Sequence, residues 1–347
     1  MTTKDPIKVL SKYPNTRYMG SKRKLIPTIA QVVDSLGAKT ALDAFAGSGC
    51  VAYLFKEMGM QVTTNDFLKF SFHIGNASIA NSTIKLSDDE IDYLINNDSG
   101  KHDFIQTKFK DLYFSDEDNA FLDNLWFNIV ELKDDKKKSL AFAAVSRACI
   151  KRRPRGMFAY TGFRYDDGRK DLTLSLKEHF VLAIKEWNDT VLNNGYECFA
   201  SNKDVFELED KGYDLVYIDP PYVSNHSDND YTRRYHFVEG FISYWKDDDI
   251  QEHTKTKKIV SHPSRFGSKT TIYKAFDDLF AKFPSSTLLV SYSSNSIPTK
   301  EDMITLLKTH RKSVEMIEVD YKYSFGTHGH KVGDNKNSVS EYLFIAK

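Results

Sequence analysis

Cysteine is scarce in this sequence: Cys50, Cys149 and Cys198 are the three cysteines in 347 residues, and they lie far apart. Three cysteines at such spacing form neither a disulfide framework nor a zinc-ligand pattern, and they suit a reducing compartment. No apolar run approaches the roughly 18 residues that a membrane span needs, and residues 1–6 lack the apolar core of a signal peptide. These absences predict a cytoplasmic protein with no membrane association.

Net charge is also absent, because 48 Lys and Arg residues balance 48 Asp and Glu residues. This balance argues against a uniformly basic nucleic-acid coat, although it is compatible with a local basic patch. The histidines of residues 223–268 (His226, His236, His253 and His262) are scattered without a metal-binding spacing. We therefore predict no metal site.

Hydrophobic patterns typical of strands and helices alternate towards both ends of the chain. Strand patterns occupy residues 40–45, 60–65, 196–200, 213–218, 287–292, 313–321 and 341–346, and helical patterns occupy 22–36, 50–58, 172–192, 269–282 and 299–310. The alternation predicts an α/β fold with a mostly parallel sheet, which the last two strands finish as an antiparallel hairpin.

Two segments interrupt this alternation. Residues 69–150 carry mainly helical patterns, and residues 223–268 are charged and irregular. We predict a main domain formed by residues 1–68 and 172–347, with a helical and basic insertion at 69–171 and a second insertion at 223–268.

A glycine-rich turn follows the first predicted strand, in the sequence Asp43-Ala44-Phe45-Ala46-Gly47-Ser48-Gly49. Glycine lets the backbone approach a ligand closely and turn into a helix N-terminus. The spacing is not that of a dinucleotide site, and Asp43 precedes the turn, where a carboxylate would repel a pyrophosphate but attract an amino group. Asp66 ends the next strand, where a carboxylate can accept both ribose hydroxyls. The pattern predicts a cationic nucleoside that carries an amino acid, such as S-adenosylmethionine; the alternative is an ordinary strand–helix turn.

The strand at 213–218 runs into Asp219-Pro220-Pro221-Tyr222. Prolines end a strand because they have no N–H to donate, and open α/β sheets bind ligands at this carboxyl edge. The exocyclic nitrogen of adenine is a poor nucleophile, since its lone pair is delocalised into the ring. Hydrogen bonds from that amine to Asp219 and to the Pro220 carbonyl would favour a pyramidal nitrogen and stabilise its developing positive charge, while Tyr222 stacks on the base. Such a pocket requires an adenine flipped out of the duplex; the alternative is a simple proline-rich turn.

A third motif lies near the N-terminus and combines an aromatic residue, a glycine turn and a basic helix start, in Tyr18-Met19-Gly20-Ser21-Lys22. By itself it is also typical of a solvated basic terminus. In this order, however, the three motifs resemble those of the adenine-specific DNA methyltransferases of the Dam-like class. The resemblance implies a Rossmann-like methyltransferase fold with a seven-stranded sheet, and an S-adenosylmethionine cofactor.

The resemblance also implies roles for the matching positions. The implied cofactor site comprises Tyr18, Gly20, Lys22, Asp43, Phe45, Ala46, Gly47, Asp66, Phe67, Asp204 and Val205. The implied catalytic site comprises Asp219, Pro220, Pro221 and Tyr222. Among these residues, Tyr18, Gly20 and Lys22 would hold the methionine end of the cofactor, and Asp204 would lie near its adenine ring.

Other methyltransferase chemistries fit the sequence less well. Enzymes that modify cytosine N4 usually have Ser in place of Asp219, and those that modify cytosine C5 need a nucleophilic cysteine after a proline, which none of the three cysteines provides. The same chemistry on RNA, on cytosine N4 or on a protein amide stays an alternative, as does a DNA-binding module without catalysis.

The most basic segment spans residues 147–170, where eight Lys and Arg residues against two aspartates leave a local charge of +6. Basic side chains neutralise phosphates and release counterions, and the interleaved aromatics can stack where a base leaves the helix. The predicted DNA contacts are Lys151, Arg152, Arg153 and Arg155, together with Arg233 and Arg234. The alternative is a solvated basic loop.

The insertion at 223–268 is predicted to be flexible and to close over the target through residues 231–236. We expect both insertions to contact double-stranded DNA, with more base specificity from 223–268. Overall, these patterns predict a monomeric, site-specific adenine-N6 DNA methyltransferase of a restriction–modification system, with a cognate restriction endonuclease encoded nearby.

Overall fold

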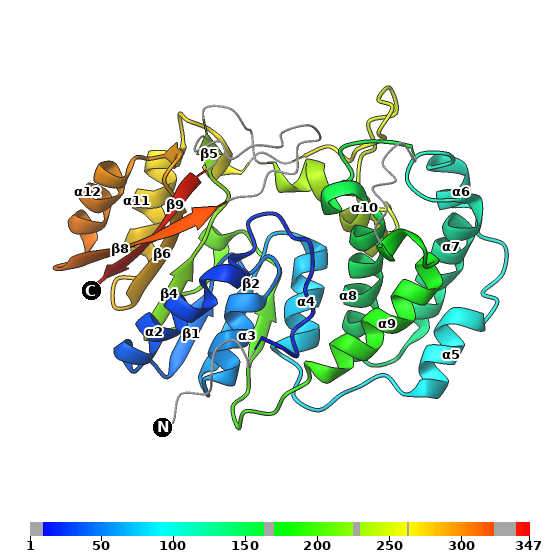
Figure 1. Ribbon diagram of the computed structural model, residues 1–347, viewed down its shortest axis with the longest axis horizontal. Coiled ribbons are helices and arrows are strands. Elements are labelled where there is room, and N and C mark those ends of the chain that lie inside the picture. Colours follow the sequence, from blue (N-terminus) through cyan, green and yellow to red (C-terminus); the bar gives the residue numbers. More distant parts are fainter. Residues whose placement is uncertain (1–9, 163–169, 225–229, 262–263, 323–337) are drawn as a thin grey trace.

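The computed structural model of the protein describes residues 10–162, 170–224, 230–261, 264–322 and 338–347 (Figure 1). Within these ranges, a seven-stranded sheet has the order β3-β2-β1-β4-β6-β9-β8. Its strands are β1 (Thr40–Asp43), β2 (Gln61–Asn65), β3 (Phe199–Ser201), β4 (Leu215–Ile218), β6 (Thr287–Ser293), β8 (Val314–Lys322) and β9 (Ser338–Ala346). Pairing is parallel from β3 to β6 and antiparallel from β6 through β9 to β8, which confirms the predicted α/β fold and its C-terminal hairpin.

Both faces of the sheet are covered, as the central strand β4 illustrates. Because side chains alternate along a strand, Leu215 and Tyr217 enter one hydrophobic core while Val216 and Ile218 enter the other. The first core contains α2 (Ile26–Leu36), α3 (Cys50–Glu57) and α4 (Lys69–Ser78), and the second contains α11 (Ile272–Lys282) and α12 (Lys300–His310). All four β4 residues are buried, as a central parallel strand requires.

A group of helices lies beside the sheet (Figure 1). It comprises α5 (Asp88–Asn96), α6 (Phe104–Lys108), α7 (Asp116–Glu131), α8 (Asp135–Arg152), α9 (Leu176–Asp189) and α10 (Tyr231–Ser243). Helix α8 packs on α4, α9 and α10, so one hydrophobic core joins this group to the sheet. In the described ranges, no helix is both long enough and apolar enough to cross a membrane.

Helix α10 corrects the prediction that residues 223–268 are irregular. Its Tyr235, Phe237 and Phe241 side chains are buried in the core, and its Glu239 carboxylate accepts hydrogen bonds from the first two backbone N–H groups of α4. His236 is also buried and lies 3.0 Å from the Tyr113 hydroxyl. Tyr235 and His236 are therefore part of the core and are not free to close over a target.

Shorter elements position the loops around the sheet. The 3-10 helices are η1 (Lys22–Leu25), η2 (Pro154–Gly156), η3 (Lys170–Leu172), η4 (Val205–Glu207) and η5 (Arg265–Gly267). Strands β5 (Val223–Ser224) and β7 (Ser296–Ile297) pair antiparallel. Because β5 directly follows Asp219–Tyr222, this pairing holds the exit of the proline loop in place.

Candidate active site

Three aspartates meet at one edge of the sheet. Strands β1, β2 and β4 are parallel neighbours, and Asp43 pairs in register with Thr64 on one side and Tyr217 on the other. Asp66 and Asp219 follow soon after those two partners, so all three carboxylates emerge at the carboxyl ends of adjacent strands. Strand order reverses between β1 and β4, and such a switch point is where open α/β sheets bind ligands.

A cavity of about 410 Å³ opens at this edge. Its lining includes every residue of the predicted cofactor site: Tyr18, Gly20, Lys22, Asp43, Phe45, Ala46, Gly47, Asp66, Phe67, Asp204 and Val205. Of the predicted catalytic residues, Asp219 and Pro221 also line it, whereas Pro220 and Tyr222 do not. Tyr222 instead packs edge-on against Tyr292, with ring centroids 5.6 Å apart.

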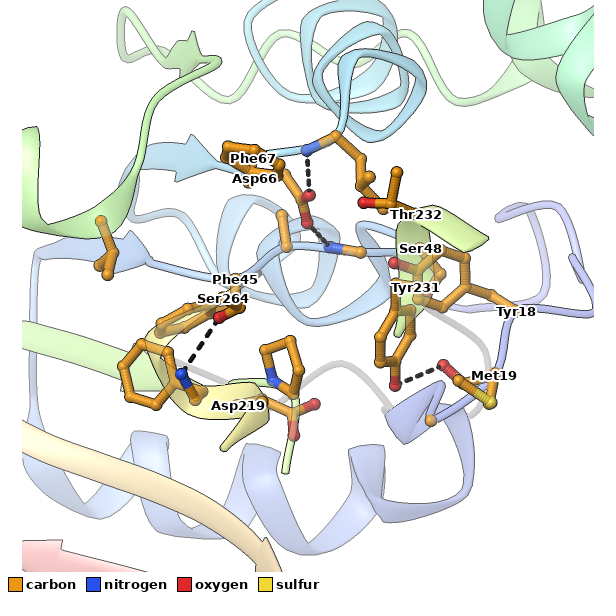
Figure 2. A pocket seen from close by; sticks show the side chains of 18 of the residues that line it. Tyr18, Met19, Phe45, Ser48, Asp66, Phe67, Asp219, Tyr231, Thr232 and Ser264 are labelled. Carbon is orange, nitrogen blue, oxygen red and sulfur yellow. Dashed lines mark hydrogen bonds between the residues drawn. The ribbon is translucent and has the colours of Figure 1, made fainter. Parts of the chain in front are cut away.

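The glycine turn is tied to the end of β2. Gly47 donates its N–H to Asp66 Oδ2 at 2.7 Å, and Leu68 donates to Asp66 Oδ1 at 2.8 Å, as Figure 2 shows. Gly47 has a φ of 50°, in the left-handed region. Burial raises the pKa of Asp66 to about 6, and the two backbone donors oppose that rise. A carboxylate held in this way keeps acceptor capacity for further hydroxyl donors.

Asp43 has an incomplete set of hydrogen bonds. Its Oδ2 accepts from the Ala52 N–H at 3.2 Å in the first turn of α3, but its buried Oδ1 has no hydrogen-bond partner in the described part of the chain. Burial, together with the negative charges of Asp219 and Asp66, raises the pKa of Asp43 to about 8. Because a nearby cation would favour the ionised carboxyl and supply the missing donor, Asp43 fits the amino group of a cationic ligand.

Asp219 is paired with a lysine inside the cavity. Lys22 Nζ lies 2.9 Å from Asp219 Oδ1, with side-chain exposures of 4% and 15%, respectively. The same ammonium donates to the Gly20 carbonyl at 3.0 Å. Burial raises the pKa of Asp219 to about 6, and Lys22 opposes that rise.

Two tyrosines of α10 hold the N-terminal motif. The Tyr235 hydroxyl accepts from the Met19 N–H at 2.7 Å. The Tyr231 hydroxyl donates to the Met19 carbonyl at 3.2 Å (Figure 2). The Tyr18 ring stacks on Tyr235 with centroids 5.2 Å apart and planes 6° apart. Tyr231 also lines the cavity. The insertion predicted to contact DNA bases thus helps to build the cavity itself.

An aromatic group forms another part of the lining, in which the predicted Phe45 is joined by Phe206 and Phe266, which were not predicted. Phe206 and Phe266 stack with centroids 5.7 Å apart, and Phe45 meets Phe266 edge-on at 5.4 Å. The Arg265 guanidinium lies 4.0 Å from the Phe206 centroid. Phe206 could have been found from its place next to Val205, but Phe266 and Tyr231 lie in the insertion, where no local pattern marks them.

A family model described as D12 class N6 adenine-specific DNA methyltransferase matches residues 18–306. The chain belongs to this family. The predicted resemblance to adenine-specific DNA methyltransferases is therefore confirmed. The match extends from the Tyr18 motif through both other motifs, so it includes the whole lining of the cavity.

Relatives of this D12-class chain are methyltransferases of restriction–modification type by name. Type II methyltransferase M2.HphI of Haemophilus parahaemolyticus is 28% identical, and the alignment covers 97% of this chain and 98% of that protein. Modification methylase LlaI of Lactococcus lactis subsp. lactis is 26% identical, and the alignment covers 95% of this chain and 55% of that protein. Type II methyltransferase M.FokI of Planomicrobium okeanokoites is 25% identical, and the alignment covers 94% of this chain and 52% of that protein. The chain thus spans about half the length of the last two.

The structure places two of the predicted DNA contacts of the basic segment, Arg152 and Arg153, against internal groups. Arg153 is 2% exposed, and its guanidinium donates to the carbonyls of Tyr113 and Tyr160. Arg152 is 18% exposed and donates to the carbonyls of Leu172 and Leu174, both at 2.9 Å. Arg153 is therefore committed to internal acceptors and its predicted DNA contact does not fit the structure, whereas a DNA contact of the partly exposed Arg152 stays a prediction.

The other predicted contacts differ in exposure. Arg233 is 47% exposed at the cavity lining. Lys151 lies 3.7 Å from an Asp171 carboxylate oxygen, and Arg234 Nη1 lies 3.7 Å from the Met157 sulfur. The side chain of Arg155 lies outside the described residues. Of the described side chains in this set, Arg233 is the exposed one, and its Nε lies 4.0 Å from Asp230 Oδ2. A phosphate contact of Arg233 stays a prediction.

Arg153 and Arg233 should respond oppositely to replacement. We expect Arg153→Met to lower the free energy of unfolding by about 2–4 kcal/mol, because two buried carbonyls lose their donors. We expect Arg233→Met to change stability by no more than about 0.5 kcal/mol but to weaken DNA binding and reduce its salt dependence. Urea denaturation and fluorescence anisotropy at several salt concentrations measure the two effects. A stable Arg153→Met protein with weakened DNA binding would contradict the internal role.

Proposed function

We propose that this chain transfers a methyl group from S-adenosylmethionine to N6 of an adenine flipped out of double-stranded DNA. The observation that carries the proposal is the opening of Asp43, Asp66 and Asp219 into one cavity. Its volume of about 410 Å³ is typical of a small-molecule site. The family match gives the same chemistry and target base.

The residues around the cavity fit the proposed cofactor from end to end. Asp43 offers an unsatisfied acceptor for the amino group, and Asp66 offers carboxylate oxygens for the ribose hydroxyls. The aromatic group of Phe45, Phe206 and Phe266 offers a flat, apolar wall for the adenine ring. When bound, S-adenosylmethionine supplies an electrophilic methyl group on a sulfonium sulfur.

Asp219 acts on the target amine in this proposal. Its carboxylate and the Pro220 carbonyl accept hydrogen bonds from N6, which localises the nitrogen lone pair for attack. Negative charge on Asp219 then stabilises the positive charge that forms on N6, until the nitrogen loses its proton. Tyr222 must turn from its contact with Tyr292 if it is to stack on the base.

We propose further that residues 1–68 and 172–347 form the catalytic domain and that the helical insertion at 69–171 contacts DNA. The insertion at 223–268 contributes residues 230–233 and 264–268 to the lining of the cavity. This supports a position of the insertion beside the target base. The names of the relatives support a restriction–modification setting with a cognate endonuclease. We propose that the protein acts as a monomer, because each event modifies one base.

The decisive test is methylation of DNA that carries no prior modification. Purified protein, S-adenosylmethionine and unmethylated genomic DNA are incubated, and the DNA is sequenced by a method that detects N6-methyladenine. We expect one methylated sequence motif, which is absent with the Asp219→Ala protein. Methyl on cytosine N4 would reject adenine as the target. If the protein binds the cofactor but methylates no DNA, DNA is rejected as the substrate and RNA becomes the substrate to test.

A further inference from the structure

The ion pair between Lys22 and Asp219 joins two motifs that lie far apart in the sequence. Lys22 begins η1, two residues after Gly20, and Asp219 directly follows the last residue of β4. Their charged atoms are 2.9 Å apart, and both residues line the cavity. The amine of the target base is proposed to donate to this same carboxylate. The lysine is therefore adjacent to the reacting group.

The lysine is anchored independently of the aspartate. An ammonium group has three donors, and one of them binds the Gly20 carbonyl at 3.0 Å. The backbone next to Gly20 is held by α10, since the Met19 N–H and carbonyl are hydrogen-bonded to the Tyr235 and Tyr231 hydroxyls. The backbone of the motif thus directs the ammonium at Asp219.

The surroundings of Asp219 would otherwise disfavour its charge. Taking a carboxylate out of water is costly unless a cation or hydrogen bonds compensate for the loss. Within the part of the chain that the structure describes, the titratable groups that face it from the neighbouring elements are Lys22 on η1, Asp43 on β1, Tyr217 on β4, Tyr231 on α10 and Glu341 on β9. Two of these are carboxyls, and Lys22 is the cation in contact.

We propose that Lys22 is the positioning residue for Asp219: it keeps that carboxylate ionised and oriented before the target base arrives. This role is additional to any contact of Lys22 with the cofactor, and it rests on the proposed function, which makes Asp219 the acceptor. A neutral Asp219 would have no charge with which to stabilise the methylated nitrogen. Lys22 therefore controls the rate of transfer through another residue.

The test measures the pH dependence of single-turnover methyl transfer at saturating S-adenosylmethionine and DNA. For the unchanged protein, the acidic limb should lie near pH 6, because Asp219 is ionised above a pKa of about 6. An opposite charge in contact lowers the pKa of a carboxyl by about one to three units. Lys22→Met should therefore move the acidic limb of the pH–rate profile to higher pH by roughly one to three units. Above that pH, the rate of methyl transfer should recover. Lys22→Arg should move the limb less.

Lys24→Met is the matched control. Lys24 is exposed on the same 3-10 helix, so its replacement removes the same charge from the same element without touching Asp219. Its acidic limb should not move. If Lys22→Met instead lowers the rate by one factor at every pH, the positioning role is overturned.

A second measurement needs no methyl transfer and separates this inference from the proposed function. The Asp219 carboxyl is followed by ¹³C NMR during a pH titration of the protein alone, with the signal assigned by its loss in Asp219→Asn. The midpoint should rise in Lys22→Met, and in Lys22→Arg by less. An unchanged midpoint in both variants overturns the inference, whereas a protein that shows the shift but methylates no DNA overturns the proposed function instead.

Discussion

Replacing Asp219 by alanine is expected to lower the rate of methyl transfer by about 1,000-fold, the loss typical when one preorganised electrostatic group is removed from a reacting centre. The carboxylate lies at the carboxyl end of β4 and opens into the cavity. Without it, the target amine loses an acceptor, and the charge on N6 loses its counter-ion. Single-turnover transfer with saturating DNA measures the effect, and DNA affinity should be largely retained.

Asp214→Ala is the matched control for this prediction. Asp214 directly precedes the same strand, at its opposite end, where its carboxylate accepts from the N–H groups of Lys39 and Thr40. Its loss should reduce stability by about 1–2 kcal/mol, the cost of two exposed hydrogen bonds, and leave the transfer rate unchanged. Full activity of Asp219→Ala would reject the proposed mechanism.

Replacing Gly47 by valine is expected to weaken cofactor binding by at least roughly tenfold, about 1.4 kcal/mol, because the added side chain would displace the wall of the cavity. The left-handed backbone also costs an L-residue about 1–2 kcal/mol, which lowers stability. Gly47 has a φ of 50°, and an added Cβ would lie 2.8 Å from a ring carbon of Tyr18. That ring cannot move easily, because it stacks on Tyr235. The Gly47 N–H that binds Asp66 would shift as well. Calorimetry with S-adenosylhomocysteine measures the affinity.

Gly212→Val separates the effect of backbone strain from the effect on the cavity. Gly212 has a φ of 70°, with no atom within 4 Å of an added Cβ, and it does not line the cavity. The strain is comparable, so stability should fall while cofactor affinity stays the same. Equal affinities of the two variants would reject Gly47 as part of the cofactor site.

Much of the candidate site could be predicted because its residues stand at strand ends. Asp43 ends β1, and Asp66 and Asp219 directly follow β2 and β4. Parallel pairing carries such positions to one edge without any knowledge of the packing. This accounts for the three carboxylates in the cavity, whereas Tyr18, Gly20 and Lys22 reach it from the N-terminal motif. The assignment of the cavity to a cofactor stays a proposal that the binding experiments address.

Helix α10 and the basic segment were harder to predict for a different reason. In α10, buried polar and aromatic residues such as Tyr235 and His236 take the positions where aliphatic residues usually stand. The spacing of aliphatic residues therefore does not indicate a helix there. In the basic segment, the high local charge predicts side chains that are exposed to solvent or bound to phosphates. Arg153 is instead buried against Tyr113, whose ring lies 5.0 Å from its guanidinium.

Local sequence was sufficient for the order of strands and helices, the glycine turn and the identity of the three carboxylates, because these depend on residues close together in the chain. Tertiary structure alone decided which partners those groups meet. Met19 and Tyr235 are 216 positions apart, and Lys22 reaches Asp219 over a similar separation. Contacts at such distances come from the packing of whole elements and leave no period or spacing in the sequence. The sequence therefore marked Lys22 as a site residue, but its pairing with the proposed catalytic carboxylate was visible only in the folded chain.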